Sequence, residues 1–167
     1  MKRYAFSLVE LILVVAILGI LAAIVLPTYQ SHAATARQSA AKDSLRIMRT
    51  QIELYKLEHN GAHPGYVDGA GAPVAILELQ FTKTTKVGGS ASASTIPSGE
   101  YIYGPYVKML PENPFNSLST ITYVDQATAF ATAADGTSSG WLYKKETAEI
   151  RLNWTGADPD GVNYYDY

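Results

Sequence analysis

The sequence contains no cysteine, so the chain can form neither a disulfide bond nor a thiolate metal site. Charged residues make up only 17% of its 167 residues, and the formal net charge of −2 comes without a basic cluster. This composition gives no support for nucleic acid as a ligand. Patterns of catalysis are missing too, because His59 and His63 lack the glutamate of an HExxH motif and no nucleophile elbow occurs. We therefore do not expect an enzyme.

What the sequence does contain is a long apolar run from Phe6 to Leu26, in which Glu10 is the only charge. A helix needs about 20 apolar residues to span a bilayer, so this run is long enough. Lys2 and Arg3 precede the run, which predicts a cytoplasmic N-terminus and a chain that continues outside. The alternative is a secretory signal cut at Ala22-Ala23. The sequence that follows has strong helix propensity, which favours a retained membrane helix.

Glu10 is an energetic exception in this run. A carboxylate in hydrocarbon costs at least about 2.5–3.5 kcal/mol, so an acid inside a membrane segment is a functional candidate by default. Either Glu10 reaches the lipid headgroups, or it pairs with a cation on a neighbouring chain. Opposite charges attract far more strongly in a bundle of low dielectric than in water. We favour the second interpretation.

The helix should continue to about Asn60, roughly 80 Å from Phe6 at 1.5 Å per residue. Residues 28–60 contain neither glycine nor proline, and Gly61 is placed to end the helix. Apolar residues recur on one face of this half at helical spacing: Leu45, Met48, Ile52 and Tyr55. That face is expected to pack on the rest of the chain.

Two residues should shape the membrane half of the helix. Pro27 lacks an amide donor and should kink the helix or open it locally. A bend at the membrane surface and a melting between Gly19 and Pro27 inside a filament remain alternatives. Gly19 lets neighbouring membrane helices approach closely.

Residues 61–167 should form one small head, which makes the chain an α+β protein. Within the head, residues 74–81 predict a helix of about two turns, whereas residues 82–100 show no periodicity and should form an exposed, mobile loop. Three segments are typical of strands: residues 119–124, 140–145 and 148–154. They predict a small antiparallel sheet packed on the long helix.

The start of the apolar run resembles the N-terminal signature of type IV pilins and of the pseudopilins of type II secretion. The similarity lies in AFSLVE at residues 5–10, followed by Gly19, Pro27 and Tyr29. It implies a pilin-like fold with a leader at 1–5, a transmembrane and filament-core helix at 6–27, an amphipathic half at 28–60 and a head at 61–167.

The resemblance also implies processing. A prepilin peptidase of this family would cleave between Ala5 and Phe6 and methylate the new amino group of Phe6. Ala5 stands where the family has glycine, and both residues are small. The free ammonium of Phe6 would then be the partner of Glu10 in a neighbouring subunit. Removal of Lys2 and Arg3 from 13 basic residues leaves 11 against 15 acidic ones, a net charge of −4.

A second segment, GPYVKMLPENPFN at residues 104–116, is similar to a stretch of the major pseudopilin of type II secretion. Its prolines fix a turning path, and its apolar anchors should strap it over the head: Tyr106, Val107, Met109, Leu110 and Phe115. This similarity and the missing cysteines favour a pseudopilin-like subunit of a type II secretion system over a type IV pilus pilin, and both remain open.

Asp158 and Asp160 lie with Gly161 in an acidic terminal segment. Major pseudopilins hold calcium in a C-terminal loop, and the resemblance implies oxygen ligands of this kind here. In this sequence, however, the acidic residues follow Asn153-Trp154 instead of preceding them. A solvated acidic terminus is the alternative.

Together these observations predict a structural subunit that polymerises through its N-terminal helix into a helical filament. Its expected partners are copies of itself, other pilins or pseudopilins, the prepilin peptidase and an inner-membrane assembly platform. The subunit should first sit in the bacterial inner membrane with its head in the periplasm, and then in a periplasmic or extracellular filament. A monomeric, membrane-anchored periplasmic binding protein is the alternative from another class.

Overall fold

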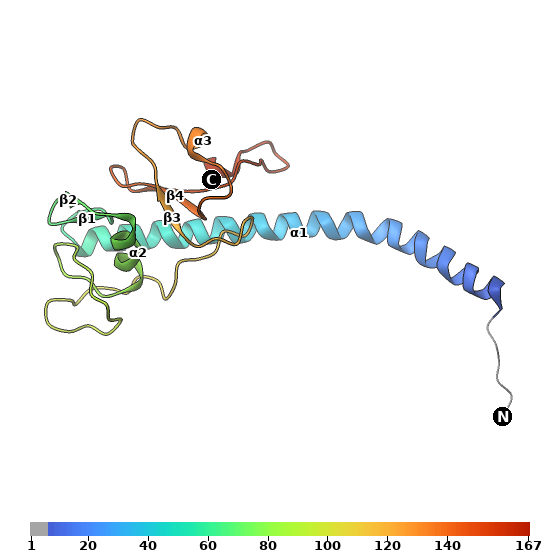
Figure 1. Ribbon diagram of the computed structural model, residues 1–167, viewed down its shortest axis with the longest axis horizontal. Coiled ribbons are helices and arrows are strands. Elements are labelled where there is room, and N and C mark those ends of the chain that lie inside the picture. The colour runs from blue at the N-terminus through green and yellow to red at the C-terminus, as the bar shows by residue number, and fades with distance from the viewer. Residues whose placement is uncertain (1–6) are drawn as a thin grey trace, which may run out of the picture. The chain divides into compact units, whose positions relative to one another are not determined.

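The structure is a computed structural model that describes residues 7–167, and of Pro27, Thr28, Gln30 and Ser31 it describes the backbone alone. The chain divides into two compact units, and the boundary in the sequence falls between Arg37 and Gln38. One long helix, α1, runs from Leu8 to Glu58 and so belongs to both units (Figure 1). The second unit contains all other helices and strands of the described chain.

Helix α1 ends where the sequence predicted. Its last residue is Glu58, and Asn60 and Gly61 then take positive φ angles of 55° and 84°. The Gly61 amide donates to the Lys56 carbonyl oxygen at 2.8 Å, which closes the helix in the manner usual for glycine. The helical backbone also continues through Gly19 and Pro27. The bend at Pro27 and the melting inside a filament stay predictions.

The predicted apolar face of α1 is confirmed as the centre of the head core. Leu45, Met48, Ile52 and Tyr55 are each at most 1% exposed. They pack in one cluster with residues of helix α2 (Val74–Thr82) and of the sheet: Leu77, Phe81, Ile121, Trp141, Tyr143, Ile150 and Leu152. Burial of this face ties the C-terminal half of α1 to the head.

The head contains a three-stranded sheet of order β3-β4-β5, built from Ile121–Tyr123, Trp141–Lys144 and Glu149–Leu152. All three predicted strands are therefore present. Strands β4 and β5 form the expected antiparallel pair, whereas β3 runs parallel to β4, so the prediction of an antiparallel sheet is wrong for this pair. The reason is the connection: residues 124–140, which include helix α3 (Phe130–Ala133), are long enough for the crossover that parallel strands require.

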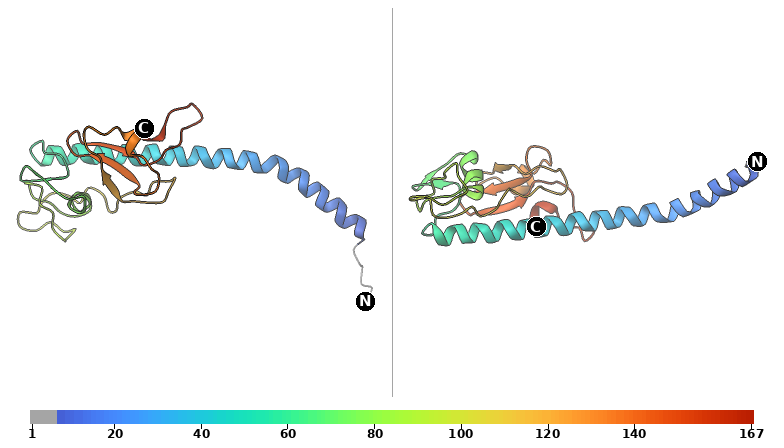
Figure 2. Two further views of the ribbon diagram at one scale, coloured as in Figure 1. Left: turned by 45° about the horizontal axis from the view of Figure 1, so that its top comes forward. Right: turned by 90° about the horizontal axis from the view of Figure 1, so that it is seen from below.

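The remaining elements are short. Strands β1 (Tyr66–Val67) and β2 (Ala70–Gly71) form a two-residue hairpin, and a 3-10 turn covers Tyr164–Asp166. The right view of Figure 2 shows the sheet and α2 on one side of the head portion of α1. In that view no described helix or strand lies on the opposite side of this portion, which therefore presents a free face.

The loop at residues 82–100 differs from its prediction in its first half. Thr84 and Thr85 are fully buried, and Thr85 pairs with both Ala91 and Tyr103 in isolated β-bridges. The Thr84 amide donates to the Ser94 carbonyl oxygen at 2.9 Å. Only residues 93–100 are exposed throughout, as expected. Serine and threonine hydroxyls satisfy the backbone here, so the first half is ordered by polar contacts that hydrophobic periodicity does not reveal.

The strap at residues 104–116 packs on the head as the sequence predicted, with one exception. Tyr106 is buried, and Val107, Leu110 and Phe115 are partly buried against the core. The Trp141 indole donates to the Pro111 carbonyl oxygen at 2.8 Å and fixes the middle of the strap. Met109 was expected to be a further anchor, and this is wrong, because its side chain is 73% exposed.

Candidate assembly site

The candidate assembly site is the apolar half of α1. Leu8–Leu26 has a mean hydropathy of 3.1 and is long and apolar enough to cross a membrane, by length and composition. None of this segment is buried within the chain. Its side chains therefore need a cover that the described residues do not provide, either lipid or other helices.

Glu10 closes the first turn of its own helix. The Ser7 amide donates to Glu10 Oε2 at 2.9 Å, and the Val9 amide donates to Ser7 Oγ at 3.3 Å. This reciprocal arrangement is a capping box, which the spacing Ser-x-x-Glu before an apolar run signals. Our reading of the sequence missed this role. A carboxylate accepts about four hydrogen bonds, so Glu10 keeps capacity for a cation beside the capping bond.

The structure gives less information on the other predicted assembly residues. A Cβ atom added at Gly19 would meet no atom within 4 Å, so the helix surface is open there and a neighbouring helix has room to approach. Pro27 lies inside the helix, but its side chain is not described. Ala5 and Phe6 lie outside the described residues, and so the predicted cleavage site stays a prediction.

Asp158 does not offer a free carboxylate to calcium. Its Oδ1 accepts from the Asp160 and Val162 amides, both at 2.9 Å. Its Oδ2 accepts from Tyr167 Oη at 2.6 Å and from Gln38 Nε2 at 3.0 Å. Each oxygen thus already accepts two hydrogen bonds, and the donors occupy the positions that a cation would need.

The surroundings of Asp158 agree with this conclusion. Within residues 7–167 no group of three or more histidine or acidic side chains is placed to hold a metal ion. The Tyr167 hydroxyl holds the pKa of Asp158 below its usual value, and burial together with Asp158 raises the pKa of Tyr167 to about 12. Asp158 and Asp160 therefore do not fit the expected calcium site. Asp158 instead fastens the terminal segment to α1 through Gln38.

Asn153 is the centre of a second polar network, whose role sequence reasoning did not detect. Its Oδ1 accepts from the Asp135 and Gly136 amides at 2.8 and 3.0 Å, and its Nδ2 donates to Asp135 Oδ1 at 2.9 Å. Backbone amides of Ser138 and Thr137 hold the pKa of Asp135 well below its usual range. Asn153 is fully buried, so this network connects the end of β5 to the turn before β4. Nothing in its spacing signalled the role.

His59, which is not part of an HExxH motif, is buried just after the end of α1. Its ring stacks on Tyr55 with centroids 3.7 Å apart. Nδ1 lies 2.8 Å from the Tyr55 carbonyl oxygen, and Nε2 lies 3.0 Å from Thr85 Oγ1. Because a carbonyl oxygen can only accept, Nδ1 carries the proton and Nε2 accepts from Thr85. Burial lowers the pKa of His59, although Tyr55 and Glu58 partly oppose this.

We expect the stability of the head to fall as the pH decreases below about 6.5, the ordinary pKa of histidine. Burial lowers the pKa of His59 in the folded chain, so below pH 6.5 the unfolded chain binds a proton more readily than the folded chain does. The free energy of unfolding therefore decreases as the pH falls. Urea unfolding of the detergent-solubilised protein between pH 5 and 8 measures it. His59→Gln should flatten the pH dependence, while His32→Gln, an exposed control, should leave it. Equal slopes in wild type and His59→Gln would contradict this assignment.

These features define a class before any comparison: a chain in which one long helix has an apolar half of membrane-spanning length and a second half that packs in the core of a small α+β head. The family described as "Prokaryotic N-terminal methylation motif" matches residues 1–26. The chain is 29% identical to type II secretion system core protein G of Vibrio cholerae over 169 residues, which cover 99% of this chain and 96% of that protein.

Two further relatives match over part of their length. Type IV major fimbrial protein FimA of Dichelobacter nodosus is 37% identical over 100 residues, which cover 60% of this chain and 61% of that protein. Core protein G of Pseudomonas aeruginosa is 39% identical over 73 residues, which cover 44% and 51%. No solved structure matches the chain significantly. The chain thus carries the N-terminal methylation motif at its start and is similar to type II secretion core proteins and to type IV fimbrial proteins.

Proposed function

We propose that this chain is a structural subunit that polymerises into a type IV-like filament, as a pseudopilin-like component of a type II secretion system. We choose a type II secretion system because the chain matches the Vibrio cholerae core protein G over 96% of that protein. FimA is matched over 61% of its length only. By their names the relatives are secretion-system components and fimbrial proteins.

The geometry supports assembly through the apolar half of α1. No part of Leu8–Leu26 is buried within the chain. When subunits leave the membrane, this segment therefore exchanges contacts with lipid for contacts with neighbouring helices. Lipid is as apolar as leucine, so burial alone favours this exchange little, and close packing and polar pairs must supply the difference. Gly19 provides the close approach, and Glu10 provides one half of an intersubunit pair with the ammonium of Phe6.

The subunit sits in the inner membrane with its N-terminus in the cytoplasm and residues 61–167 in the periplasm. A prepilin peptidase then removes residues 1–5, and an inner-membrane platform adds the subunit to a filament of like chains. We propose that the apolar helix at 6–27 becomes the filament core and that the heads form its surface.

Mass spectrometry of the protein purified from its native host should give a mature N-terminus at Phe6, with one added methyl group. The small side chain of Ala5 suits the cut, and a free amino terminus is what Glu10 needs as a partner. Ala5→Glu, which introduces bulk and charge at the cut, should leave the leader in place. A mature terminus at Met1 or after Ala22 in the unaltered protein would exclude this route to a filament.

A further inference from the structure

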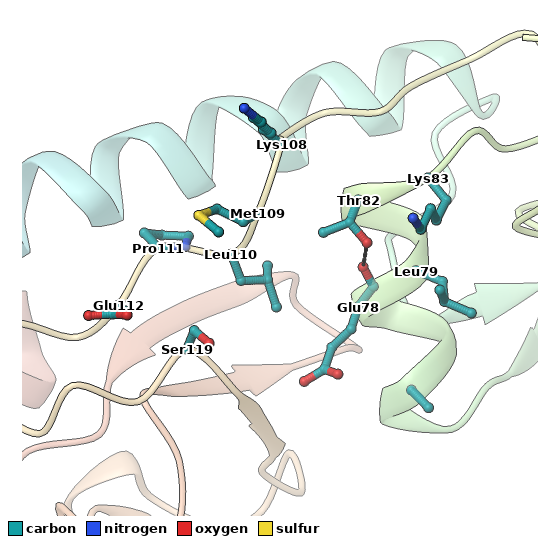
Figure 3. A pocket seen from close by; sticks show the side chains of 11 residues that line it. Glu78, Leu79, Thr82, Lys83, Lys108, Met109, Leu110, Pro111, Glu112 and Ser119 are labelled. Atoms are coloured by element: carbon teal, nitrogen blue, oxygen red, sulfur yellow. Dashed lines mark hydrogen bonds between the residues drawn. The ribbon is translucent and has the colours of Figure 1, made fainter. Parts of the chain in front are cut away.

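Two surfaces of the head are left uncovered and share no residue. The first, the α1 stripe, consists of Ile47, Leu54 and Leu57, which are 51%, 41% and 81% exposed. The second, the α2 groove, is a hollow of about 910 Å³ between α2 and the strap (Figure 3). Its lining residues are Ala75, Glu78, Leu79, Thr82, Lys83, Lys108, Met109, Leu110, Pro111, Glu112 and Ser119.

The α1 stripe lies on the free face of α1. Ile47 and Leu54 are seven residues apart and so project from one face, whereas the core residues such as Met48 project from the other. Single exposed apolar residues are ordinary, but an aligned group on a helix is typical of an interaction surface. Asp43 and Arg46 lie at the N-terminal end of the stripe and line a hollow with Ile47, so this end carries one charge of each sign.

The α2 groove has an apolar lining and charged edges, and the stripe is likewise apolar with charges at one end. Leu79, Leu110 and the exposed Met109 give it an apolar lining, and methionine suits surfaces that adapt to a partner. In Figure 3 the two lysines, Lys83 and Lys108, lie along its upper edge, and the two glutamates, Glu78 and Glu112, lie along its lower edge. The groove edges therefore also carry both signs, and on opposite sides.

We propose that the α1 stripe of one copy of this chain docks into the α2 groove of the next copy. Stripe leucines cover the apolar lining of the groove, Arg46 meets the glutamate edge, and Asp43 meets the lysine edge. The inference rests on the proposed filament function. The two surfaces are different patches of one chain, so their contact is heterologous and repeats along an open helical assembly instead of closing into a dimer.

Paired cysteines test this contact, and the natural absence of cysteine makes every disulfide attributable to the introduced residues. Met109→Cys is combined in turn with Ile47→Cys, Leu54→Cys and Leu57→Cys in the full chain, in cells that assemble filaments. At least one pair should give a ladder of disulfide-linked multimers on non-reducing gels, since bridged Cα atoms must lie within about 7 Å. The matched control is Ile96→Cys with the same partners, because Ile96 is also 73% exposed but does not line the groove.

The outcomes separate this inference from the filament function. Filaments without a ladder from any Met109 pair, or with an equal ladder from the Ile96 control, would overturn the docking and leave the function standing. Failure of the unaltered chain to form filaments would overturn the function itself. If the cysteine variants do not assemble, charge reversal decides: Arg46→Glu should lower filament yield at least tenfold, and added Glu112→Arg should restore it. Absence of restoration would overturn the docking.

Discussion

Glu10→Gln should abolish filament assembly while the protein still folds and inserts into the membrane. The change removes the charge that pairs with the ammonium of Phe6 but keeps an oxygen at the third position of the helix, where glutamine also completes a capping box. A hydrogen bond to a charged group contributes about 1.5–3 kcal/mol, or roughly 10- to 100-fold per contact. This loss recurs at every added subunit. Sheared or pelleted filaments, compared with the membrane-bound pool by immunoblot, measure the effect.

Ser7→Ala is the matched control for Glu10→Gln. It removes the hydroxyl that accepts from the Val9 amide and keeps the carboxylate, at a cost of about 1 kcal/mol in helix stability. Filament yield should therefore stay near that of the unaltered chain. If Glu10→Gln assembles normally, the intersubunit pair is wrong. If both variants lose assembly equally, the essential role of Glu10 is the cap.

Asn153→Ala should destabilise the head by about 3 kcal/mol. The substitution leaves the Asp135 and Gly136 amides without their acceptor, and an unsatisfied buried polar group costs about 1–3 kcal/mol. The fully buried position also gives water little access to replace the lost bonds. Such a change is a large share of the stability of a small domain. Urea unfolding of the full chain in detergent, followed by tryptophan fluorescence, gives the difference.

Asn163→Ala provides the comparison for Asn153→Ala. Asn163 is the same residue type in the same head, but its Nδ2 makes one exposed hydrogen bond to Asp166 Oδ2 at 3.2 Å. A surface substitution of this kind should change stability by no more than about 0.5 kcal/mol. Equal destabilisation by the two variants would show that the hydrogen bonds of Asn153 contribute no more to the stability of the head than an exposed hydrogen bond does.

The features that follow from apolar periodicity could be predicted from the sequence. The spacing of Leu45, Met48, Ile52 and Tyr55 identified the buried face of α1, and Gly61 identified its end. The short helix α2 and all three strands of the sheet also lie where the pattern placed them. These features depend on local propensity and on which face is apolar, and the sequence carries both kinds of information directly.

The features that depend on polar partners far apart in the chain could not be predicted. The Asp135 amide that donates to Asn153 and the Gln38 side chain that donates to Asp158 come from distant segments, and no spacing rule brings them together. The parallel pairing of β3 depends on how residues 124–140 cross the sheet, which a strand pattern does not specify. Met109 resembled a core anchor by type alone, and only its surroundings show that it faces out.

The bond from the Ser7 amide to Glu10 has a consequence for the energetics of the proposed filament. Before assembly the Glu10 carboxylate already accepts a hydrogen bond from its own chain, so it is not without a partner in the membrane. A joining subunit then exchanges or shares that partner rather than acquiring its first one. The contribution of Glu10 to assembly is therefore the difference between two bonded states, and it is smaller than the free energy of a pair formed by a carboxylate that had no earlier partner.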